Sequence, residues 1–188
     1  MEVLFQIETN IGEVTIAPVQ QKDAWGICDF VVANEDRLRT FFPKTLAQNL
    51  TPELAELFTL KKERQYSLKE EYLYTLKLNA KKVVGLIYIK ELQKVIGQGE
   101  FAYCIDYTIE GQGVITKAVA FLVDYAFENL ELNRLQIIVH KDNVGSIKVT
   151  EKNNFMWQKT LSKAFTPPGK NAMNMELYER FKINNNER

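Results

Sequence analysis

Gly111 and Gly113 stand in a short turn between a segment rich in β-branched and aromatic residues and a long apolar stretch with helical periodicity. Glycine adopts a positive φ at little cost, and without a Cβ it lets another group approach the backbone closely. The first turn of the following helix adds unpaired N–H groups and the positive end of a dipole. This order predicts a phosphate-binding turn, although a lone Gly-x-Gly pair is as often a plain turn.

Hydrophobic periodicity predicts where the other elements lie. We expect strands over residues 12–17, 72–78, 83–89, 101–107, 135–140, 155–165 and 171–181, and helices over 23–32, 51–68, 113–130 and 143–152. The strand, helix and strand between Phe101 and His140 imply a parallel crossover within one mixed sheet that has helices on both faces. We expect a single domain over 1–183 and a frayed tail over 184–188.

Charge and cysteine content exclude several classes of protein. The 188 residues include 24 Lys and Arg and 24 Asp and Glu, so no net charge attracts nucleic acid or an acidic membrane surface. Cys28 and Cys104 are too few for a disulfide framework, which favours buried thiols and a cytoplasmic location. No apolar run approaches the roughly 20 residues that cross a bilayer, and no Cys/His cluster has metal-ligand spacing. We therefore expect no nucleic acid, membrane or metal among the partners.

Two common phosphate-binding folds do not fit the pattern. A P-loop requires Gly-Lys followed by Ser or Thr, and this chain has no such motif. A dinucleotide-binding Rossmann unit places its glycines after the first strand, whereas here they follow an antiparallel meander. A different phosphate-binding fold is needed.

The segment Glu100–Phe155 resembles the acetyl-CoA-binding half of the GNAT superfamily of N-acetyltransferases, and more narrowly its RimJ/RimL branch. Four stretches carry the resemblance: EFAYCI before the glycine turn, the helix containing DYAF, the strand NRLQIIVH, and DNVGSIKVTEKNNF. The resemblance implies the GNAT acyl-CoA N-acyltransferase fold. This is an α/β (α+β) fold with a mixed, mostly antiparallel twisted sheet of about seven strands and helices on both faces.

The resemblance also implies acetyl-CoA as co-substrate. The pantetheine arm would lie between two splayed strands beside Cys104 and Ile105, where a bulge on the first strand frees an N–H for the thioester oxygen. Asn143 would bond the pantetheine arm, and Ser146 would lie near the sulfur and protonate the departing thiolate. The pyrophosphate would be held by backbone N–H groups of Gln112, Gly113, Val114, Ile115 and Thr116.

Three positions depart from the family's pattern. Glu110 stands where the turn motif usually has Arg or Gln, and Ile115 where it usually has Gly or Ala, so a negative charge is expected near the pyrophosphate. Asn154 replaces a glycine that often has a positive φ, and asparagine is the best substitute there.

The attacking amine must be neutral, so a general base is expected. The candidate bases are Glu91, Glu100 and Asp106, each of which is also explained as a solvated carboxylate at a strand end. Tyr103 matches the family's tyrosine, and a core aromatic is an equal explanation. The lone His140 is better explained as a cap or a satisfied polar residue than as a base. In the helix at 143–152, Asn143, Ser146 and Thr150 share one face that we expect to meet the coenzyme.

We therefore expect an N-acetyltransferase that moves acetyl from acetyl-CoA to a primary amine by direct attack, with a protein N-terminal amine as the first candidate acceptor. A small amine such as a polyamine or antibiotic is the alternative, and a non-catalytic acyl-CoA sensor is another. The acceptor site would be built from helices 23–33 and 51–68, with Phe41, Phe42 and Pro43 at its wall. A monomer and a homodimer both remain open.

Overall fold

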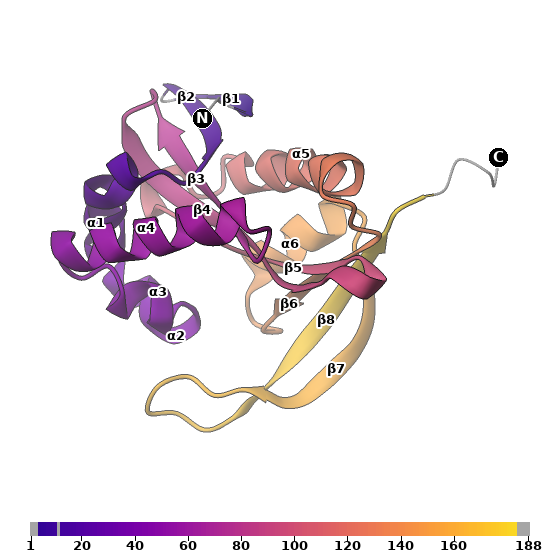
Figure 1. The fold of residues 1–188 in the computed structure, drawn as a ribbon. Helices are drawn as coiled ribbons and strands as arrows, with labels where there is room; N and C mark the ends of the chain where they lie inside the picture. The colour runs from indigo at the N-terminus through magenta and orange to yellow at the C-terminus, as the bar shows by residue number, and fades with distance from the viewer. Residues whose placement is uncertain (1–3, 11, 184–188) are drawn as a thin grey trace.

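A computed structural model describes residues 4–10 and 12–183 of the chain. One sheet of eight strands runs through them in the order β1-β2-β3-β4-β5-β6-β8-β7 (Figure 1). The strands are β1 (Phe5–Thr9), β2 (Gly12–Pro18), β3 (Tyr72–Leu78), β4 (Lys82–Gln93), β5 (Gln98–Ile105), β6 (Arg134–Val139), β7 (Met156–Phe165) and β8 (Met173–Phe181). Among the strands of the described residues, only β5 and β6 pair in parallel, which confirms the predicted crossover. The expected tail over 184–188 lies outside the described residues.

Six α-helices accompany the sheet in the described ranges. They are α1 (Ala24–Ala33), α2 (Glu35–Phe41), α3 (Pro43–Ala47), α4 (Pro52–Ser67), α5 (Val114–Asn129) and α6 (Val144–Lys152). As its sequence predicts, α4 begins with Pro52 and is capped by the Thr51 side chain, which accepts from the Leu54 N–H at 3.4 Å. None of the described helices has the length and hydropathy needed to span a membrane.

Helices α2 and α3 and strand β1 were not predicted, and β4 and β5 have other bounds than expected. The eighth strand, β1, was not predicted because only Ile7 among its five residues is buried, so its alternation is too weak to identify. The strand expected over 101–107 ends at Ile105. Asp106 ends it by accepting from the Thr108 N–H at 2.8 Å and starting a 3-10 turn over Tyr107–Ile109.

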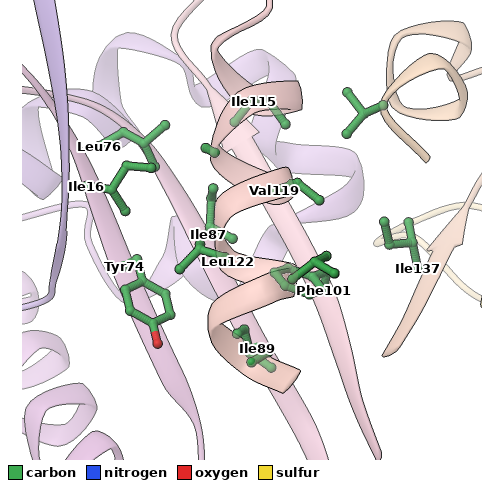
Figure 2. Packing of buried hydrophobic residues seen from close by; sticks show 14 of the residues in the cluster. Ile16, Tyr74, Leu76, Ile87, Ile89, Phe101, Ile115, Val119, Leu122 and Ile137 are labelled. Carbon is green, nitrogen blue, oxygen red and sulfur yellow. The ribbon is translucent and has the colours of Figure 1, made fainter. Parts of the chain in front are cut away.

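The period-two alternation of the strands supplies two hydrophobic layers. On one face, Ile87, Ile89 and Phe101 pack beneath α5, which contributes Val119 and Leu122 (Figure 2). On the other face, residues of opposite parity such as Leu73 and Leu86 pack against α1, α3 and α4. Figure 1 shows α1 to α4 gathered on one side and α5 on the other, with the β7–β8 hairpin extending away from the body.

A gap opens in the middle of the sheet between β5 and β6. Their parallel pairing ends at Phe101 with Ile137, whereas β5 stays paired with β4 as far as Ile105 with Gly85. The edge of β5 over 102–105 that faces β6 therefore has no strand partner. This splay was expected. The bulge was expected on β5 itself, but residues 100–105 pair with β4 without a shift, and the irregularity lies on β4 at Lys90–Gln93.

Candidate active site

The glycine turn lies at the open end of this gap and has the backbone that its sequence predicts. Gly111 and Gly113 have φ of 78° and 77°, and a Cβ built on either would meet no atom within 4 Å. No side chain caps α5, and its first intrahelical bond runs from the Lys117 N–H to the Gly113 carbonyl at 3.0 Å. The N–H groups that precede it in the first turn are left to a ligand or to water. The turn therefore fits an anion such as a diphosphate.

A cavity of about 500 Å³ lies between this turn, the splayed edge of β5 and the start of α6. Most of the predicted coenzyme residues line it: Cys104, Ile105, Gly113, Val114, Ile115, Thr116, Asn143 and Ser146. Gln112 is the exception, because its side-chain amide turns back to donate to the Thr108 carbonyl at 3.4 Å. The predicted coenzyme residues thus come together even though they belong to three separate elements.

The positions that depart from the family pattern have structural explanations. The Glu110 carboxylate forms an ion pair with Arg37 of α2, with Nη2 and Oε2 2.5 Å apart. Ile115 is 7% exposed and belongs to the hydrophobic core, and it also lines the cavity. Asn154 has a φ of 57°, as predicted for a residue that replaces glycine.

The start of α6 is held by Asn143, whose side chain accepts from the Ser146 N–H at 3.0 Å. Asn143 and Ser146 face the cavity as predicted, but Thr150 does not. It is fully buried, and its hydroxyl donates to the Ile147 carbonyl at 2.6 Å. The prediction for Thr150 was wrong because the stripe of α6 that lines the cavity runs through Gly145, Val149 and Lys152; Ser146 lies at its edge, and Thr150 lies beyond that edge, toward the core.

A second cavity, of about 610 Å³, adjoins the first one and shares part of its lining. Phe41, Phe42 and Pro43 form part of its wall, as predicted, and α4 contributes Phe58 and Lys62. Helix α1, which was also expected to help build the acceptor site, contributes no residue to this lining and packs against α4 and β4. The residues that line both cavities are Phe41, Phe42, Tyr103, Asn143 and Ser146.

Tyr103 and Ser146 lie at this junction. The Tyr103 hydroxyl donates to the Ser146 carbonyl at 3.4 Å. Burial raises the pKa of Tyr103 well above its usual value, and the bond to Ser146 offsets only part of the rise. Its proton therefore stays in place at neutral pH. Burial likewise raises the pKa of the neighbouring Cys104 thiol to about 12, so this cysteine is not a thiolate nucleophile.

Of the three candidate bases, two line the second cavity. Glu100 pairs with Lys90, with Nζ and Oε1 2.8 Å apart, and Glu91 sits at the β4 irregularity with a φ of 50°. Asp106 lines neither cavity. Burial works to raise the pKa of Asp106, but hydrogen bonds from Thr108 and the charge of Lys82 outweigh it, so the pKa is lowered. This carboxylate serves as a cap.

His140 lines the second cavity, and its Nδ1 accepts from the Asp142 N–H at 3.3 Å. This hydrogen bond gives His140 a capping role, one of the roles that the sequence favoured for it. In the described ranges, no three His, Cys, Asp or Glu side chains come together in a way that could hold a metal ion.

Sequence reasoning missed the cations of the first cavity, which are Arg37, Lys148 and Lys152. A local signal existed for two of them, because Lys148 and Lys152 are spaced i, i+4 on the helix that carries Ser146. Arg37 gave no such signal, since it reaches the turn from a helix 73 residues away in the chain.

Comparison with known proteins agrees with this geometry. The family described as acetyltransferase (GNAT) domain matches residues 13–156. "Putative ribosomal N-acetyltransferase YdaF" of Bacillus subtilis (strain 168) is 30% identical over 157 residues, covering 81% of this chain and 82% of that protein. Spermidine N(1)-acetyltransferase of Escherichia coli (strain K12) is 31% identical over 97 residues, covering 50% of this chain and 52% of that protein.

Among solved structures, Mycobacterium smegmatis RimJ in complex with CoA-disulfide shares the fold, with a TM-score of 0.85 at 16% identity over 96% of this chain and 87% of that one. The family match covers more than half of the chain, and the B. subtilis relative is similar over most of its length. The chain therefore belongs to the acetyltransferase (GNAT) domain family, with RimJ/RimL-like relatives, and is an acetyl-CoA-dependent N-acetyltransferase.

Proposed function

We propose that this enzyme transfers acetyl from acetyl-CoA to the N-terminal α-amine of a protein. The observation that carries the proposal is the pair of cavities that share Tyr103 and Ser146. One cavity ends at an uncapped, glycine-lined helix start suited to a diphosphate, and the other is large enough for a chain terminus. Acetyl-CoA supplies an activated thioester, and the amine would reach it from the opposite side.

We assign coenzyme binding to the backbone of Gly113–Thr116, to the open edge of β5 at Cys104 and Ile105, and to Asn143. These groups offer N–H donors and an amide and need no side-chain charge. Gln112 would contribute only its backbone N–H, because its side chain turns away from the cavity.

The transfer forms a C–N bond, breaks the C–S bond, removes a proton from the amine and requires one for the sulfur. We assign the base to Glu100, directly or through water, because its carboxylate lines the second cavity, where Lys90 Nζ holds it at 2.8 Å. We assign proton delivery to the sulfur to the hydroxyls of Tyr103 and Ser146. Tyr103 is suited to this role because it remains protonated at neutral pH.

The charges of the second cavity favour a protein terminus over a polyamine. Four lysines and three glutamates line it, and two of the glutamates, Glu71 and Glu100, already pair with Lys62 and Lys90. A polycation would find little uncompensated negative charge there. An α-amine of pKa about 8 is also about one-tenth neutral at pH 7, against about one in 2,500 for an amine of pKa 10.4, so a carboxylate base suffices.

The name of the B. subtilis relative agrees with this acceptor, and the spermidine acetyltransferase relative makes a polyamine the second candidate. A direct test incubates the protein and acetyl-CoA with peptides bearing a free N-terminus and an internal lysine, with the same peptides N-formylated, and with spermidine. We expect thiol release only with the free N-terminus, and acetyl on the α-amine by mass spectrometry. Preferential acetylation of spermidine would replace the proposal with the polyamine alternative. Coenzyme binding without thiol release for any acceptor would favour the sensor.

We further propose that residues 1–183 act as one domain in the cytoplasm. The continuous eight-stranded sheet supports the proposal of a single domain. A single cooperative transition in calorimetry is expected, and two separable transitions would contradict it. Sedimentation would decide between a monomer and a homodimer.

A further inference from the structure

One face of α2 forms a wall of the coenzyme cavity. Asn34, Arg37, Leu38 and Phe41 follow one another at i, i+3, i+4 and i+7, and all four line it. Asn34 is 3% exposed, and its side-chain oxygen has no hydrogen-bond partner among the described residues. Its amide nitrogen donates to the Phe30 carbonyl at 2.8 Å. A buried acceptor without a partner in a cavity wall indicates a face that a ligand completes.

Arg37 extends from this face to the glycine turn. Its guanidinium meets the carboxylate of Glu110, the residue immediately before Gly111, at 2.5 Å. The side chains are 40% and 54% exposed, so as a plain surface ion pair they would add little to stability. Arg37 and Glu110 both line the cavity. The charged side chains of its lining are three cations, Arg37, Lys148 and Lys152, and one anion, Glu110.

A guanidinium has five N–H donors in a planar fork, so contact with one carboxylate leaves donors for a second anion. Glu110 holds Arg37 in the wall of the same cavity that the start of α5 lines, where a diphosphate would bind. The position where the family's motif usually supplies a basic or amide side chain is acidic here, and the cation comes instead from α2.

We propose that Arg37 binds the pyrophosphate of the coenzyme directly, and that Glu110 positions it. The proposal rests on the proposed function, since it needs acetyl-CoA in this cavity. Because α2 also carries Phe41 into both cavities, the bound pyrophosphate fixes the helix that forms part of the acceptor wall.

Calorimetric titration with CoA tests the contact without any turnover. Arg37→Ala is expected to weaken binding about tenfold or more, the usual loss for a charge-assisted hydrogen bond. The matched control is Arg39→Ala: Arg39 lies on the same helix and pairs with Glu35 at 2.6 Å, but lines neither cavity. Its affinity should stay within about twofold of the wild type, as expected for a surface charge. Equal affinity of the Arg37 variant and the wild type would overturn the proposal.

A double variant distinguishes direct binding of phosphate by Arg37 from simple neutralisation of the Glu110 charge. If Arg37 only cancels the Glu110 charge, Arg37→Ala with Glu110→Gln should bind CoA as well as Glu110→Gln alone, which would overturn direct binding. If Arg37 contacts phosphate, the double variant stays about tenfold weaker than Glu110→Gln. CoA lacking its 3′-phosphate should show the same loss on Arg37→Ala; disappearance of the loss would refute the pyrophosphate assignment. Failure of the wild type to bind CoA would instead refute the proposed function.

Discussion

Replacing Gly113 by alanine should separate the two reasons for a glycine in the phosphate turn. Gly113 has a φ of 77° and a ψ of 6°, and a Cβ there would have no atom within 4 Å. The only cost within the protein is therefore the left-handed backbone, about 1 kcal/mol for an alanine. In a chain of this length that corresponds to a fall in Tm of about 2–4 °C.

The matched control is Gly169 in the turn between β7 and β8. It has a φ of 68°, an added Cβ would again meet nothing within 4 Å, and it lines neither cavity. Gly169→Ala should therefore lose the same stability, about 1 kcal/mol in urea unfolding, because the backbone penalty is the same. Its affinity for CoA should equal that of the wild type.

Gly113→Ala should in addition weaken CoA binding about tenfold or more, because a methyl group beside the N–H groups of α5 blocks the close approach of the pyrophosphate. Calorimetric titration of both variants measures this difference. If Gly113→Ala binds CoA as tightly as Gly169→Ala, close backbone approach at Gly113 is not needed and the assignment of the turn is wrong. A much larger stability loss at Gly113 than at Gly169 would show that more than φ differs between them.

Three further predictions concern catalysis and pH. Tyr103→Phe and Ser146→Ala should each lower kcat, by about 100-fold for Tyr103, with little change in the Kd for CoA; an unchanged kcat for either variant removes that hydroxyl from proton delivery. Glu100→Gln should lower kcat by about 100-fold and Glu91→Gln should not, and the reverse result in steady-state assays would move the base to Glu91. Burial raises the pKa of Tyr74 and Tyr88 far above the ordinary value of 10.0. The unfolded chain therefore loses these protons first, and stability, full below pH 10, should fall above it by up to about 3 kcal/mol per pH unit. Urea midpoints that stay constant from pH 9 to 11 would contradict this.

The parts of the site that follow from local chemistry could be predicted from the sequence. Positive φ at Gly113, the capping role of Asn143 and the strand before the turn depend on residues within a few positions of one another. Such preferences act over one turn or one strand and survive in almost any tertiary context. The short helices α2 and α3 could not be predicted in this way, because only Leu38, Thr45 and Leu46 on them are buried and their periodicity is weak.

Contacts between distant segments could not be predicted. The Lys62–Glu71 pair, with Nζ and Oε1 2.5 Å apart, joins the end of α4 to the start of the meander, and the Lys90–Glu100 pair depends on the register of β4 with β5. Register is set by burial of one face of the sheet, and nothing in the composition of a single strand reveals it. The pairing of the candidate base Glu100 with Lys90 could therefore be identified only from the structure.

Glu110 shows how this limit affects a functional conclusion. Considered with its neighbours alone, it places a negative charge beside a diphosphate site and predicts weak coenzyme binding. With Arg37 in contact at 2.5 Å, the pair is neutral, and the cavity keeps two further cations, Lys148 and Lys152. The charged side chains of the cavity therefore sum to two positive charges, which attract a diphosphate at the short distances inside a cavity. Under the proposed assignment of this cavity to the coenzyme, the acidic residue in the motif is no obstacle to binding so long as α2 is docked, and the packing of α2 becomes part of the coenzyme site.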